Sequence, residues 1–180
     1  MLDGEEKIIE DAVKGKSSAF GVLYDHYQPM IYRFVIVKVG RREDAEDITH
    51  QVFIAAWQNI ATYAHRGNPF SSWLYRIARN HVVDHYRANA KKKGEASIDR
   101  LDPDSFEIAG SLQADLSLKL DMENVQRAIV KLKPDHQDVI IMRFIEDLSL
   151  RETARAMDKS EGAVKLIQHR AIKELQKLLS

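Results

Sequence analysis

The sequence contains no cysteine, so disulfide bonds and thiolate metal sites are excluded. A chain without disulfides suits a reducing compartment, and we expect it to be cytoplasmic. No window holds the roughly 18 uncharged apolar residues of a membrane span. The acidic start, MLDGEEKIIEDAVKGK, also lacks the basic and apolar regions of a signal peptide. We therefore expect a protein that is neither exported nor inserted in a membrane.

The chain has no excess of charge of either sign, because 27 basic residues balance 27 acidic ones. A protein that holds nucleic acid by itself needs clustered positive charge for the phosphates. Any nucleic-acid contact must therefore depend on local clusters or on a larger complex.

Signatures of catalysis are also missing from the sequence. It has no glycine-rich phosphate loop, nucleophile elbow or convincing pair of carboxylates, so we expect neither an enzyme nor a cofactor. His81 and His85 beside Asp84 resemble half of a zinc site, but no third ligand accompanies them, and we predict no metal.

Glycine and proline are scarce, with 8 and 4 residues, and apolar residues recur at helical spacing over long stretches. The fold class is therefore predicted to be all-α. Helices are expected from a cap at Ser17 or Ser18 to Gly40, with a kink at Pro29, and from Asp44 past Trp57. A third is expected from the pair Asn68-Pro69 to about Arg87.

The character of the chain changes after Lys93, where acidic residues dominate and the periodicity fades. Low hydrophobicity with excess like charge does not offset the entropy of ordering, so we predict a flexible acidic linker over residues 94–119. It would join two small helical domains, 1–93 and 120–180, and would let them pack together or spread apart. The second domain is expected to end in two short helices.

The segment LSLRETARAMDKSEGAVKLIQHRAIKEL carries the most specific pattern. Ser149 and Glu152 form a capping box, and Ser160 caps another helix after a three-residue turn, which predicts a helix-turn-helix. Val164, Ile167, Ala171 and Leu175 would form the buried stripe of its second helix. The outward face would suit DNA; the alternative is an ordinary solvated basic helix. This outward face comprises Gly162, Lys165, Leu166, His169, Arg170 and Lys173.

A second basic region spans residues 71–93, with six basic residues against one acidic residue. Aromatic rings lie among them and can stack on unpaired bases or pack in a core. Core packing is favoured for Trp57 and Trp73, and both readings stay open for Tyr63 and Tyr75.

The segments YDHYQPMIYRF, EDAEDITHQVFIAAW and FSSWLYRIARNHVVDHYR, followed by the helix-turn-helix, resemble in this order the extracytoplasmic-function (ECF) sigma factors of the sigma-70 family. The resemblance implies a sigma-2 helical bundle that binds core RNA polymerase and melts the minus-10 element. It also implies a sigma-4 helix-turn-helix bundle that reads the minus-35 element, and an anti-sigma factor that occludes both.

The resemblance also implies roles for individual residues. The polymerase β′ clamp helices would meet Asp44, Asp47 and Gln51, with Phe53 in the core. The segment LKPDHQDVIIMRFIEDLS would meet the polymerase β flap. The minus-10 contacts would be Tyr63, Arg76, Arg79, Asn80 and Arg87. The minus-35 contacts would be Ser160, Glu161, Gly162, Lys165, Leu166, His169, Arg170 and Lys173.

Some positions depart from the family pattern. His50-Gln51 replaces a common Gln-Glu pair and removes one negative charge from the expected polymerase face. Gln137 replaces a usual arginine, and Asp147 and Asp158 replace usual glycines. Aspartate tolerates a left-handed backbone better than most residues, so we expect the turn at Asp158 to survive. Arg79 and Asn80 lie 100° apart on a helix and need not share one role.

Two other classes of protein remain as alternatives. An operator-binding regulator that acts without polymerase would need dimer symmetry and more local positive charge, and would leave the first domain unexplained. A helical scaffold without DNA contact would explain the acidic helix start near Asp44 but not the outward face of the last helix.

Overall fold

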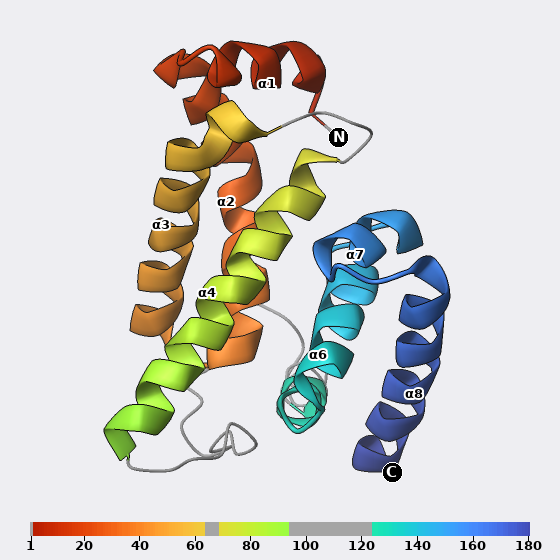
Figure 1. Cartoon of the computed structure of the whole chain (residues 1–180). Helices are drawn as coiled ribbons and strands as arrows, with labels where there is room; N and C mark the ends of the chain where they lie inside the picture. The colour runs from red at the N-terminus through yellow and green to blue at the C-terminus, as the bar shows by residue number, and fades with distance from the viewer. Residues whose placement is uncertain (1, 64–68, 94–123) are drawn as a thin grey trace, which may run out of the picture.

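A computed structural model of the chain describes residues 2–63, 69–93 and 124–180, and all regular structure in these ranges is helical (Figure 1). The predicted fold class is thus confirmed. The first module contains α1 (Glu5–Val13), α2 (Ser17–Val39), α3 (Arg42–Asn59), the 3-10 turn η1 (Ile60–Thr62) and α4 (Phe70–Lys93). The second module contains a helix at 124–130, α6 (Pro134–Ile140), the π-helical segment η3 (Ile141–Ile145), α7 (Leu150–Ala156) and α8 (Glu161–Leu179).

The predicted linker, residues 94–119, and the predicted cap at Asn68 lie outside the described residues. Among the described helices, none is both long and apolar enough to cross a membrane.

Local signals account for several helix ends. Gly40 ends α2 in the left-handed conformation with φ of 74°. Ser149 accepts a hydrogen bond from the Glu152 amide, and the Glu152 carboxylate accepts one from the Ser149 amide, which completes the capping box of α7. Ser160 likewise caps α8 by accepting from the Ala163 amide at 3.2 Å. These three predictions are confirmed.

Other predicted boundaries were wrong. The N-cap of α2 is Lys16, which makes no side-chain cap, so neither Ser17 nor Ser18 has the predicted role. Helix α3 begins at Arg42 rather than Asp44. Helix α4 continues past Arg87 to Lys93, because Ala and Lys residues there favour a helix and nothing breaks it. Helix α8, with 19 residues, is not short.

Two aspartates hold the left-handed conformation that glycine usually adopts. Asp158, with φ of 55°, lies in the turn between α7 and α8, and Asp147, with φ of 51°, precedes α7. The carboxylate of aspartate makes this backbone conformation less costly than it is for other side chains. The turn of the helix-turn-helix therefore forms as predicted.

Helix α4 belongs to the core of the first module and also faces α7 of the second (Figure 1). Leu74 and Tyr75 of α4 are fully buried, as are Phe34 of α2 and Val52 of α3. Buried residues of the second module, including Val139, join the same continuous hydrophobic cluster. The position of α4 therefore determines which surfaces of each module are covered by the other module and which are exposed to solvent.

The capping box gives a direct test of the start of α7. We expect Ser149→Ala to lower the free energy of unfolding by about 1 kcal/mol, because the Glu152 amide loses its acceptor. Ser17→Ala is the matched control, because the serine at the start of α2 makes no cap and its loss is expected to change stability by less than about 0.5 kcal/mol. Urea denaturation of both variants measures the difference, and equal effects would contradict the assigned caps.

Candidate nucleic-acid interface

The outward face of α8 is open to solvent along the helix. Val164 and Ala171 are fully buried, and Ile167 and Leu175 are half-buried, as the predicted stripe requires. The large apolar side chain of Leu166 is 50% exposed. All eight residues predicted for the minus-35 element are exposed: Ser160, Glu161, Gly162, Lys165, Leu166, His169, Arg170 and Lys173.

Gly162 has no steric role within the protein. A Cβ added there would meet no other atom within 4 Å, and its backbone is helical. Glycine in a helix costs stability relative to alanine, and the space at Gly162, like that at Gly21 of α2, would accept a methyl group.

The minus-10 residues of α4 divide into two sets. Arg76, Asn80 and Arg87 are exposed and fall within about 40° of one another around the helix axis. Val83, which the sequence analysis did not single out, is exposed in the same row. An apolar side chain between cationic ones is a feature of surfaces that contact bases as well as phosphates.

Arg79 lies on another side of α4 and is held by the second module. Its Nε donates to Asp138 at 2.6 Å and its Nη2 to Asp135 at 3.2 Å, and only 19% of its side chain is exposed. Arg79 and Asn80 therefore have different surroundings. Arg79 is largely covered in this conformation, and its place among the minus-10 contacts stays a prediction.

Tyr63, for which core packing and base stacking were both left open, is covered in this structure. Its ring is 8% exposed and packs against Phe70 and Trp73, with centroids 5.4 and 5.2 Å away. Burial, with a smaller contribution from Glu5, raises the pKa of Tyr63 to about 12. The ring is thus part of the core in this structure, where it packs among aromatic neighbours.

The other aromatic side chains follow the core reading to different degrees. Tyr75 is fully buried, and burial raises its pKa well above the usual range. Trp73 is half-buried, while Trp57 packs on Phe20 at 4.9 Å but stays 39% exposed.

The predicted polymerase face on α3 is partly open. Asp47 and Gln51 are exposed in one row, and Ile54 and Gln58 continue that row toward the end of the helix. Ile54 is an exposed apolar residue that the sequence analysis did not name, although its position three residues after Gln51 places it on the same side of the helix.

The third residue predicted for this face, Asp44, has contacts within the chain. Asp44 is half-buried and lies 3.8 Å from Arg41 and 3.7 Å from His85, so it is less available to a partner than Asp47. Phe53 is in the core, as expected.

The segment expected to meet the β flap presents exposed apolar side chains at Phe144 and Ile145. Gln137 has a different task, because its buried amide donates to the carbonyls of Val130 and Leu132. These hydrogen bonds join the end of the helix at 124–130 to α6.

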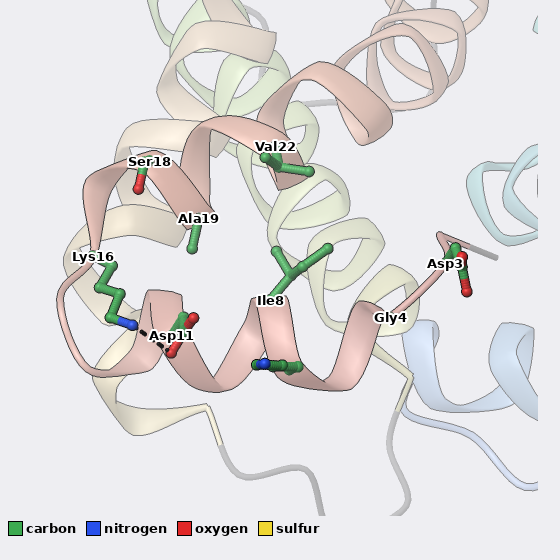
Figure 2. A pocket seen from close by; sticks show the side chains of 9 residues that line it. Asp3, Gly4, Ile8, Asp11, Lys16, Ser18, Ala19 and Val22 are labelled. Carbon is green, nitrogen blue, oxygen red and sulfur yellow. Dashed lines mark hydrogen bonds and ion pairs between the residues drawn. The ribbon is translucent and has the colours of Figure 1, made fainter.

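A groove between α1 and α2 contains none of the predicted site residues (Figure 2). Its apolar floor is formed by Ile8, Ala19 and Val22, and an ion pair of 3.0 Å joins Lys16 to Asp11 at one end. Nothing in this arrangement indicates a ligand.

Comparison with known proteins follows the division into two modules. The profile of sigma-70 region 2 matches residues 23–92, and that of sigma-70 region 4 matches residues 128–177. Together these matches cover the helices of both modules from Leu23 onward.

Individual relatives agree with the profiles. The ECF RNA polymerase sigma factor SigW of Bacillus subtilis is 32% identical over 97% of this chain and 96% of its own length. BldN of Streptomyces coelicolor, also an ECF sigma factor, is 36% identical over 96% of this chain, which spans 65% of that protein.

A solved structure shows the same fold. It is the complex of the sigma factor RpoE with the anti-sigma factor NepR from Bartonella quintana, with a TM-score of 0.68 and 22% identity over 89% of this chain and 96% of that one. With two matched regions, and a relative aligned over nearly its whole length, the chain belongs to the ECF sigma factors of the sigma-70 family.

Proposed function

We propose that this chain binds core RNA polymerase and directs it to promoters, with α8 reading the minus-35 element and α4 acting at the minus-10 element. The exposed face of α8 carries this proposal. Lys165, Arg170 and Lys173 lie on it beside Leu166, within a helix-turn-helix whose caps are both made. Cationic side chains there suit phosphates and guanine edges, and an exposed leucine suits a thymine methyl group.

Polymerase is the partner that completes this activity. The neutral net charge disfavours tight DNA binding by the chain alone, so promoter binding is expected only in the complex. The row of Asp47, Gln51 and Ile54 on α3 would dock on the β′ clamp helices, and Phe144 near α7 would dock on the β flap. The protein itself would contribute no catalytic group and would act in the cytoplasm.

An anti-sigma factor is the second proposed partner. The related fold of RpoE is solved with its anti-sigma factor NepR, and the exposed apolar residues Ile54, Trp57 and Phe144 give a protein partner surfaces to cover. Such a partner would compete with polymerase for the same faces.

Run-off transcription separates this proposal from an operator-binding regulator. Purified chain is mixed with core polymerase and a library of promoter fragments, and the same duplexes are tested with the chain alone. We expect specific transcripts only when both proteins are present. Tight sequence-specific binding by the chain alone, with no effect on transcription, would instead identify an autonomous regulator.

Two cations of α8 are expected to carry much of the minus-35 contact. Lys165→Ala and Arg170→Ala are each expected to weaken holoenzyme binding to a duplex minus-35 fragment by roughly fivefold to a hundredfold, the loss of one phosphate or base contact. Affinity for core polymerase is expected to stay unchanged. Lys177→Ala, an exposed lysine in the last turn of α8, is the matched control. Equal losses of DNA and polymerase binding would point to misfolding instead.

Gly162→Ala tests close approach of DNA to the start of α8. The substitution is expected to raise the free energy of unfolding by up to about 1 kcal/mol, because alanine favours helix and the site has space for a methyl group. It is also expected to weaken minus-35 binding by the holoenzyme at least fivefold. Gly21→Ala in α2, where an added Cβ would also meet no neighbour, is the control. It is expected to gain stability and to leave minus-35 binding by the holoenzyme unchanged. Unchanged DNA binding by Gly162→Ala would exclude close backbone approach.

Asp47→Lys tests the docking face on α3. We expect at least a tenfold loss of affinity for core polymerase, because the cationic side chain would repel a basic partner at an exposed position. Asp25→Lys, an exposed aspartate of α2 outside this row, is the control for the change in net charge. Fluorescence anisotropy of the labelled variants with core enzyme measures both affinities. An unchanged affinity of the Asp47→Lys variant would contradict the assignment of the docking face to α3.

A further inference from the structure

Helix α8 packs against α6 (Figure 1), and two polar contacts join it to α6 and η3. Nδ1 of His136 on α6 lies 2.6 Å from the carboxylate of Glu174. Because an ionised carboxylate only accepts hydrogen bonds, the imidazole is the donor. Nε of Arg143 on η3 donates to the side-chain carbonyl of Gln168 at 3.3 Å. Both contacts end on the helix that carries the proposed minus-35 face.

These contacts are partly sheltered from solvent. The side chains of His136 and Glu174 are 14% and 37% exposed, and Arg143 and Gln168 are half-buried. Arg143 is itself held in place, because its guanidinium group also donates to the backbone carbonyl of Leu148. Such contacts keep their geometry better than a pair of long side chains that moves freely in solvent.

Gln168 and Glu174 flank the buried stripe of α8, one on each side. With 100° per residue, the stripe spans about 80° around the helix axis, from Ile167 at one edge to Leu175 at the other. Gln168 lies about 20° beyond the edge at Leu175, and Glu174 lies about 20° beyond the edge at Ile167. The two polar contacts therefore enclose the apolar contact from both sides.

This arrangement defines the rotation of α8 about its own axis. The hydrophobic effect has no direction, whereas a hydrogen bond weakens steeply when its distance or angle is wrong. A rotation by about 20° would move a side-chain end, roughly 5–6 Å from the axis, by about 2 Å. A displacement of that size exceeds what either hydrogen bond tolerates, so the two contacts resist rotation in both directions.

The same rotation would displace the outward face of α8. Lys165 and Arg170 belong to the same rigid helix and would turn through the same angle. Binding residues must be held within about 10–20° of their productive geometry. Contacts to base edges specify the sequence, while contacts to phosphates mainly position the protein. The rotation of α8 therefore affects the choice of bases more than the total affinity for DNA.

We propose that Gln168 and Glu174 are positioning residues for minus-35 recognition: through Arg143 and His136 they fix the rotation of α8 and thereby determine which bases its outward face selects. The inference rests on the proposed role of α8 at the minus-35 element. In this role neither side chain contacts DNA, because both act through the residues of the outward face.

Base selectivity of the holoenzyme tests the inference. Core polymerase with the full-length wild-type chain first selects its preferred sequence from duplexes with a randomised minus-35 region. Selectivity is then the ratio of the affinity for the selected duplex to the affinity for single-base variants of that duplex. Gln168→Leu with Glu174→Leu removes both acceptors and keeps side chains that favour a helix. We expect selectivity to fall at least fivefold and affinity for core polymerase to stay unchanged.

Conservative variants at the same positions separate positioning from charge and stability. Glu174→Gln removes the same charge as Glu174→Leu but keeps an acceptor for His136, and Gln168→Glu keeps an acceptor for Arg143. We expect both to retain selectivity within twofold of wild type, although Gln168→Glu adds a negative charge and lowers total affinity for DNA. Gln176→Leu, at an exposed position of α8, is the control for the change from glutamine to leucine and is expected to retain selectivity.

Two outcomes would overturn the inference. One is wild-type selectivity in the folded leucine variant, and the other is an equal loss of selectivity in the conservative variants. Circular dichroism reports folding, and if the double variant does not fold, Gln168→Leu alone decides by the same criterion. A wild-type holoenzyme that selects no minus-35 sequence would contradict the proposed role of α8 itself. Selection by the wild type that the leucine variant retains would contradict only the positioning role.

Discussion

The two ion pairs of the Asp138 carboxylate are the interaction on which the relative position of the two modules depends. It is buried between a lysine from the end of α2 and an arginine from α4, so one side chain of the second module joins two helices of the first. Replacing either cation by a neutral side chain would leave this carboxylate buried without that partner, which is strongly destabilising.

Helix α4 shows how one helix can serve three surfaces. Leu74 and Tyr75 belong to the core, Arg79 faces the second module, and Asn80 with Arg87 faces solvent. Successive residues are turned by about 100°, so neighbouring residues such as Arg79 and Asn80 face different surroundings. An exposed α8 and a covered Arg79 follow from this geometry.

Features that depend on neighbours in the sequence were predictable from the chain. The capping box at Ser149, the cap at Ser160 and the outward face of α8 are set by residues within a few positions of each other, so spacing alone reveals them. The family resemblance, confirmed by the matches to both sigma-70 regions, extended this to the order of the modules. The prediction of a cap at Ser17 or Ser18 was wrong, because serine is only a preferred residue at the N-cap and a helix can begin without it.

The sequence by itself determined the helices, their polar and apolar faces and the family, because these follow from local periodicity and from motifs read in order. The tertiary structure alone decided the surroundings of Tyr63 and Arg79. The ring of Tyr63 is buried by Phe70 and Trp73 of α4, and Arg79 is paired with α6, more than 50 residues away. The sequence does not show whether a basic or aromatic residue is exposed to a ligand or is paired within the chain. Only the packing of the folded chain distinguishes these two cases.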